Sequence, residues 1–118
     1  MGSTGSLEAT EAASAAVQKT PNRVSLDSMN AKVAAEYFFT ADKAIGGMAM
    51  PATAALDVLT VCIIVMRNGF TVIGKSAPAD PANFNEELGR KFAREDAVRQ
   101  LWPLEGYALR EKLSGFAQ

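Results

Sequence analysis

The sequence predicts a single α+β domain: an N-terminal helix, an antiparallel sheet built on a β-hairpin, and a long helix followed by a short C-terminal helix. Three observations predict it. Val58–Met66 is an apolar run rich in Val and Ile, Asn68-Gly69 then separates it from a second apolar run, and an amphipathic pattern starts at Pro81. With 118 residues, 48% hydrophobic and 21% charged, the chain has the size and composition of one globular domain.

The N-terminal part predicts a tail and one short helix. Residues 1–22 are small and polar, so burial cannot offset the entropy lost on ordering them, and a flexible tail before a domain at 23–118 is expected. Oxygens at 25–28 can cap a helix running from about Leu26 to Ala35. The aromatic residues 37–40 predict a short strand or a continuation of that helix. Residues 42–55 predict a loop, with a helical turn on each side of its glycine pair.

The next elements are the two strands of the hairpin. Leu56–Met66 is apolar at nearly every position, which is typical of a strand covered on both faces. Asn68-Gly69 predicts a type I′ turn with positive φ at both residues, and residues 70–74 form the returning strand. So small a domain has few helices to cover that strand. A dimer or higher homo-oligomer is therefore expected, with the helix from Leu26 as the alternative cover.

The C-terminal third predicts helices. Pro81 suits a first helical turn, Asp80 suits its N-cap, and residues 84, 88 and 92 share an apolar face, so a helix is expected over 81–101. Trp102-Pro103 predicts a bend, after which residues 104–113 form the short final helix.

Composition excludes several classes of function. The net charge of −1 lacks the basic excess of proteins that coat nucleic acid, so no polymeric nucleic acid partner is expected. With no histidine and one cysteine, the usual zinc sites and histidine-based catalysis are excluded, and neither a cofactor, a metal nor an enzymatic activity is expected. Cys62, inside an apolar run, predicts a buried, inert thiol. With no secretory signal and no spanning segment, a cytoplasmic protein without a membrane partner is expected.

Five residues are candidates for binding a ligand. Arg90 and Arg94 lie four residues apart on one stripe of the long helix, and Arg110 arrives from the final helix. Arginine forks suit phosphate oxygens. Phe70 could supply a platform for a flat ring, and Asn83 an amide for a base edge.

Ordinary surface and core roles compete with this interpretation. The pairs Glu86–Arg90 and Glu95–Arg99 have the favourable i,i+4 order, which predicts surface ion pairs on a solvated helix face. The aromatic side chains could equally belong to the core.

Several segments together carry a recognisable combination of residues. The segments are AEYFFT at 35–40, NGFTVIGKSA at 68–77, DPANF at 80–84, ELGRK at 87–91 and LWPLEGY at 101–107. The combination resembles small phage proteins classed by gene 49 of one enterobacterial podophage and gene 66 of another, and the resemblance covers about Val24 to Leu113. Pro78 departs from it, because members often have a cysteine after the Ser-Ala pair.

The resemblance implies a phage protein acting in the cytoplasm of an infected host cell. The chain is also similar to the phage anti-Thoeris sponge proteins, which form multimers and bind the cyclic ADP-ribose signal of bacterial TIR-domain enzymes without cleaving it. This similarity implies sequestration of a cyclic nucleotide, with Arg90, Arg94 and Arg110 on phosphates, Phe70 on adenine and Asn83 on a base or ribose edge. The alternative is a host-takeover protein that binds and inhibits a host protein.

Overall fold

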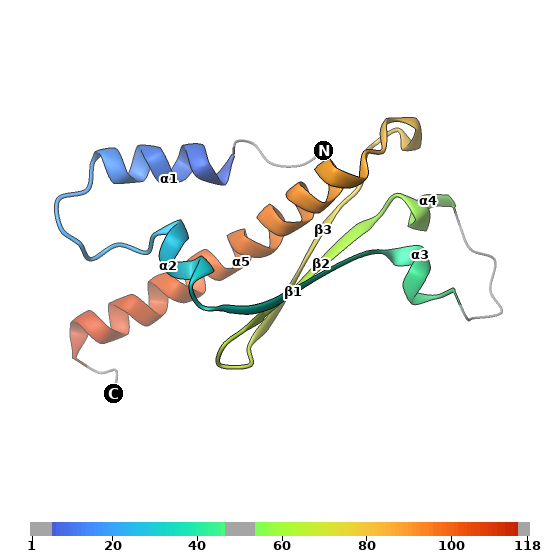
Figure 1. The fold of residues 1–118 in the computed structure, drawn as a ribbon. Helices are drawn as coiled ribbons and strands as arrows, with labels where there is room; N and C mark the ends of the chain where they lie inside the picture. Colours follow the sequence, from blue (N-terminus) through green and yellow to red (C-terminus); the bar gives the residue numbers. More distant parts are fainter. Residues whose placement is uncertain (1–5, 47–53, 116–118) are drawn as a thin grey trace.

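The computed structural model describes residues 6–46 and 54–115, where a long helix packs on a three-stranded antiparallel sheet (Figure 1). The sheet order is β1-β2-β3, and the long helix contacts β3 and β2, which confirms the α+β class. The strands are β1 (Val33–Thr40), β2 (Thr60–Met66) and β3 (Thr71–Ser76). The helices are α1 (Leu7–Ala16), α2 (Leu26–Asn30), α3 (Ala41–Ala44), α4 (Ala54–Asp57), the 3-10 helix η1 (Pro81–Asn83) and the long α5 (Glu86–Ser114).

Helix α1 lies inside the segment for which the sequence predicts a flexible tail. The side chain of Ser6 caps it by accepting from the N–H of Ala9 at 2.9 Å. Leu7 is buried in the core cluster, and Arg23 donates to Glu11 at 2.7 Å. One apolar anchor and one ion pair therefore connect α1 to the rest of the described chain.

The chain leaves the helical conformation earlier than expected, because α2 ends at Asn30. The carbonyl of Lys32 accepts from the backbone N–H of Arg67 at 2.8 Å, and strand pairing with β2 starts at Val33. Pairing thus overrides the helical spacing of residues 31–35, for which the prediction is wrong. The strand at 37–40 is confirmed, as are the helical turns α3 and α4 on both sides of the glycine pair; residues 47–53 lie outside the described residues.

The β-hairpin is confirmed, but its turn differs from the prediction. Gly69 has φ +90°, whereas Asn68 has no positive φ. The N–H of Gly69 donates to the carbonyl of Met66 at 2.9 Å, and the N–H of Met66 donates to the carbonyl of Phe70 at 2.8 Å. This is a three-residue loop ending in a left-handed glycine, so the type I′ prediction is wrong. The start predicted for the first strand is also too early, because α4 extends to Asp57.

Helix α5 is continuous through Pro103, so the predicted separate final helix is wrong. Pro103 is exposed, and packing through buried residues such as Val98 and Leu101 carries the helix past the missing N–H. The helix also starts later than predicted: Asn85 caps it by accepting from the N–H of Leu88 at 2.9 Å, while Asp80 caps η1.

The core lies between α5 and one face of the sheet. A Cβ at Gly74 would lie 2.5 Å from the backbone nitrogen of Ala97 and would overlap the carbonyl oxygen of Ala93, so glycine lets β3 approach the helix closely. Cys62 is fully buried, as predicted, and burial raises the pKa of its thiol to about 11. The buried apolar residues are Leu7, Met29, Cys62, Ile64, Met66, Val72, Ala93, Ala97, Val98 and Leu101.

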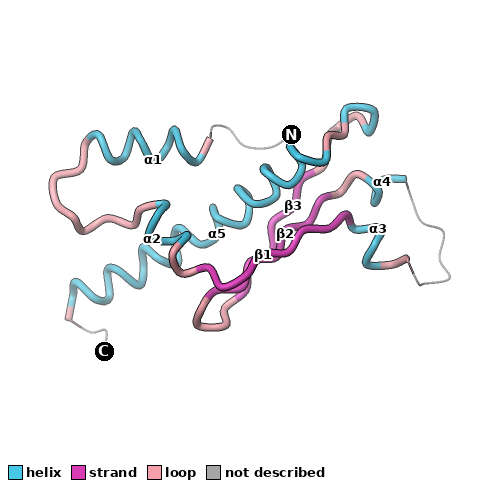
Figure 2. The backbone as a smooth tube through the Cα atoms, viewed as in Figure 1, coloured by secondary structure: helices cyan, strands magenta, loops and turns pink. Residues whose placement is uncertain are grey.

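The opposite face of the sheet is open within residues 6–46 and 54–115. Along β2 the side chains alternate between buried and half-buried, because α5 covers only the first set. Across the open face the pairing aligns Tyr37, Ile63 and Ile73, and the two outer side chains are each 58% exposed. Within one copy of the described chain, α5 therefore covers one face of the sheet, and cover of the second face by another subunit stays a prediction. In Figure 2, α3 and α4 lie beyond the end of the sheet that is opposite the hairpin turn.

Within the same residues, no helix has both the length and the apolar character needed to cross a membrane.

Candidate functional site

A groove lies between the hairpin turn and the C-terminal half of α5, and we call it the hairpin groove. Its volume is about 450 Å³, in the range of small-molecule sites. Met66, Leu101 and Leu104 give it apolar walls, and charged or polar side chains line the rest. The lining residues are Lys32, Met66, Arg67, Asn68, Phe70, Leu101, Leu104, Glu105 and Ala108.

Two cationic side chains, Lys32 and Arg67, line the groove, and they differ in their hydrogen bonds. The Nζ of Lys32 donates to Oε1 of Glu105, which joins the start of β1 to α5. The Nε of Arg67 donates to the carbonyl of Ala31 at 2.7 Å. Among the described residues, nothing bonds to the two Nη atoms of Arg67. Its guanidinium is thus positioned through Nε, while its outer nitrogens remain able to donate to an anion.

An aromatic ring and an amide complete the groove. Phe70 follows the turn directly, and its side chain is half exposed. The Oδ1 of Asn68 accepts from the N–H of Phe70 at 2.9 Å, which orients the amide and leaves its NH₂ as a donor. The hairpin groove therefore offers a flat apolar surface, a cation and an amide donor to one ligand.

The structure does not bring the five predicted binding residues together. Phe70 lines the hairpin groove, and Arg110 is exposed two residues beyond Ala108, a lining residue. Arg90 lies toward the other end of α5, about 30 Å from Arg110 at 1.5 Å of rise per residue. Asn83 lies in η1, also at that other end, beside a small depression of about 50 Å³. One chain alone does not assemble these side chains around one ligand.

Arg94 holds secondary-structure elements together. Its Nε donates to Oε1 of Glu36 at 2.8 Å, and its Nη2 donates to Oε2 of Glu36 at 3.1 Å and to Oδ1 of Asn30 at 2.8 Å. These bonds tie α5 to β1 and to the end of α2. The guanidinium is occupied by the protein itself, in contrast to the phosphate contact expected from the sequence.

The acidic residues of α5 follow the surface prediction only in part. Arg90 donates to Glu86 at 2.9 Å, which confirms one i,i+4 pair. Glu95 is buried, with 4% of its surface exposed, and its Oε2 accepts from Nζ of Lys91 at 3.2 Å. A solvated position for Glu95 was therefore wrong, because this turn of the helix faces the packed side of the molecule.

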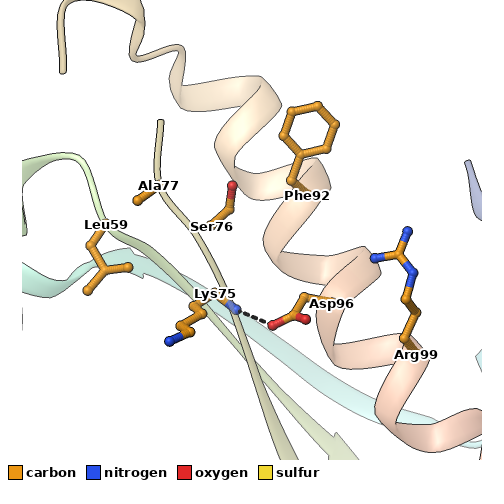
Figure 3. Close-up of a pocket in the computed structure, with 7 residues that line it drawn as sticks. All are labelled: Leu59, Lys75, Ser76, Ala77, Phe92, Asp96 and Arg99. Carbon is orange, nitrogen blue, oxygen red and sulfur yellow. Dashed lines mark hydrogen bonds between the residues drawn. The ribbon is translucent and has the colours of Figure 1, made fainter. Parts of the chain in front are cut away.

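A second depression, of about 290 Å³, lies where β3 passes α5 (Figure 3). Its central polar contact is internal: the backbone N–H of Lys75 donates to Oδ2 of Asp96 at 2.9 Å. Figure 3 shows Phe92 and Arg99 pointing away from this bond, so an aromatic ring and a cation do not converge here. The hairpin groove is the better candidate.

Sequence reasoning missed Lys32, Arg67 and Glu105. Arg67 directly precedes the Asn-Gly pair, so its place at the hairpin turn was available from the sequence. Lys32 and Glu105 are 73 residues apart and meet only through the packing of α5 on the sheet. No group of three or more potential metal ligands occurs in residues 6–46 and 54–115.

Comparison with known proteins gives one match. A family model described as phage protein (N4 Gp49/phage Sf6 gene 66) family matches residues 24–113. Among curated proteins and among solved structures, nothing matches. The matched span contains every residue that lines the hairpin groove.

Proposed function

The chain belongs to the phage protein (N4 Gp49/phage Sf6 gene 66) family, and we propose that it acts against host defence by sequestering a cyclic nucleotide signal of the cyclic ADP-ribose type. One observation carries the proposal. The ring of Phe70 and the outer nitrogens of Arg67 border a single groove of about 450 Å³. A nucleotide presents a flat base and charged phosphates, so it needs both kinds of contact at once.

The groove supplies a contact for each part of such a ligand. The base stacks on Phe70, and phosphate oxygens accept from Arg67 and Lys32. The NH₂ of Asn68 donates to a base or ribose oxygen, because its Oδ1 is already used by the N–H of Phe70. The apolar wall at Leu101 excludes water from the stacked base.

Binding without cleavage follows from the same side chains. Glu105 is the one carboxylate among the residues that line the groove, and it is paired with Lys32. An acid-base reaction needs a group free to exchange a proton with the ligand, and this pair is poorly suited to it. Sequestration needs only affinity, which agrees with a chain that has no histidine.

Calorimetry with cyclic ADP-ribose isomers tests the proposal. Native protein should bind, and Arg67→Ala should bind about 10- to 150-fold more weakly, because a charge-assisted contact contributes roughly 1.5–3 kcal/mol. Phe70→Ala, which removes a half-exposed ring, should also weaken binding. Arg90→Ala, at the far end of α5, is the matched control and should keep the native affinity.

Two results would overturn this function. Equal affinities for native protein and both groove variants would remove the hairpin groove from the site. A failure of native protein to bind any cyclic nucleotide would favour inhibition of a host protein instead. That second candidate is supported by two exposed apolar side chains of α5 near the groove, Leu104 and Tyr107, which could contact a protein surface.

A further inference from the structure

The two outer strands of the sheet differ in how their edges are protected. On β3, the outward N–H of Lys75 donates to Oδ2 of Asp96 at 2.9 Å, and the outward carbonyl of Ile73 accepts from Nε2 of Gln100 at 2.6 Å. Both of these side chains, the carboxylate of Asp96 and the amide of Gln100, belong to α5. Helix α5 therefore occupies the groups that another strand would need, and the β3 edge is closed.

The β1 edge is open among the described residues. Just past the strand, the N–H of Ala41 donates to the carbonyl of Leu59 at 2.9 Å, so the backbone of Ala41 faces the β2 side. Tyr37, which is opposite Ile63, lies four residues earlier, and its backbone groups face β2 as well. Backbone groups alternate in direction along an antiparallel strand, so those of Glu36 and Phe38 point away from β2. No described residue bonds to these outward groups.

We propose that β1 pairs antiparallel with β1 of a second copy, so that two three-stranded sheets join into one six-stranded sheet. The strand reads VAAEYFFT, with no lysine and no proline, the residues that protect exposed edges. Its single charge, Glu36, is already paired with Arg94 of its own chain, so the edge brings no unpaired carboxylate to the interface. Because the other edge is closed, the pairing ends at a two-fold dimer and does not extend into a fibre.

Charge and overlap select the register. Residues directly opposite one another share a face of the sheet, so a two-fold axis passes at one residue of the strand. An axis at Glu36 would place two carboxylates opposite each other, which is unfavourable. An axis at Phe38 would pair only residues 36–40. An axis at Tyr37 pairs residues 34–40, with the irregularity of β1 between Val33 and Ala35 at the ends of the paired segment. Glu36 of each copy then exchanges backbone hydrogen bonds with Phe38 of the other.

The size of the interface sets the expected affinity. Residues 34–40 span about 23 Å of strand, and one paired edge of this length buries less than the roughly 800 Å² per partner of a standard stable interface. We therefore expect a monomer–dimer equilibrium in the micromolar range.

Sedimentation of the full chain from about 1 to about 200 µM, with two matched variants, tests the pairing. Tyr37 and Ile73 are both 58% exposed on the open face, and both pair with Ile63. Tyr37→Lys places like charges at the two-fold axis and should abolish the dimer. Ile73→Lys lies on the closed edge and should leave the dimerisation constant within about twofold of native.

Other outcomes overturn the proposal. A native chain that stays monomeric across the range excludes the dimer. Equal loss of dimer in both lysine variants indicates packing through the sheet face, and no loss in either places the contact elsewhere. If Tyr37→Lys does not fold, amide hydrogen exchange on the native protein tests the pairing instead. The N–H groups of Glu36 and Phe38 should gain protection as concentration rises, and exchange independent of concentration contradicts edge pairing.

Discussion

Arg94 shows, at the scale of one residue, that helical spacing can single out a side chain and still not predict its hydrogen-bond partners. The i,i+4 stripe with Arg90 is a property of α5 alone. The partners of Arg94, Glu36 and Asn30, come from β1 and α2, more than fifty residues away along the chain. A local pattern cannot predict such pairs, and the arginine most suited to a ligand by sequence is the one most engaged in holding the fold.

A stability measurement tests this role of Arg94. Arg94→Ala should lower the free energy of unfolding by about 1–3 kcal/mol, because two bonds to a carboxylate and one to an amide are lost. Arg110→Ala, at an exposed position of the same helix, should change it by less than about 0.5 kcal/mol. Urea unfolding gives both values, and a neutral Arg94→Ala variant would refute the structural role.

Two glycines test the packing of α5 on β3 at the scale of elements. Gly74→Ala should destabilise the protein by about 3 kcal/mol or more, because the new Cβ meets backbone atoms of Ala93 and Ala97 that cannot rotate away. Gly106→Ala is the matched control: its Cβ meets nothing within 4 Å, and alanine favours the helix by up to about 1 kcal/mol. Thermal melts should move in opposite directions; a Gly74→Ala variant as stable as native would contradict the close approach.

Helix α1 makes a pH-dependent contribution. The hydrogen bond from Arg23 holds the pKa of Glu11 below its ordinary value of 4.5. A lowered carboxyl pKa means stabilisation that is complete above pH 4.5 and lost as the pH falls through the lowered pKa. Native protein should therefore melt above Glu11→Gln at pH 7, and the two melting curves should converge as the medium becomes acidic. A difference that persists unchanged in acid would show that this ion pair is not its source.

The elements themselves were predictable where local chemistry decides them. The Asn-Gly pair between two apolar runs predicted the hairpin, and the face shared by residues 84, 88 and 92 predicted a long helix. The prediction of a type I′ turn was wrong because, of the Asn68-Gly69 pair, only Gly69 takes a positive φ. The predictions that the first helix continues to Ala35 and that a separate helix follows Pro103 were wrong, because sheet pairing and core packing override local preference.

At the scale of the whole molecule, the candidate site depends on how α5 crosses the sheet. The place of Phe70 at the hairpin end of the groove was predictable because Phe70 follows the turn. Lys32 and Glu105 reach the same groove only through tertiary packing, which the sequence does not encode locally. The other predicted residues Asn83 and Arg90 lie at the opposite end of α5, so chemical suitability alone did not place them.

Recovery of the ligand from the protein tests the proposed sequestration most directly. Protein is mixed with cyclic ADP-ribose at a matched concentration, free ligand is removed by ultrafiltration, and the retained protein is heat-denatured to release what it held. Mass spectrometry of the released fraction should show intact cyclic ligand at a ratio approaching one per groove, with a clearly lower ratio from Arg67→Ala at the same concentration. Ligand found entirely in the filtrate, or released in a linearised form, would contradict binding without cleavage.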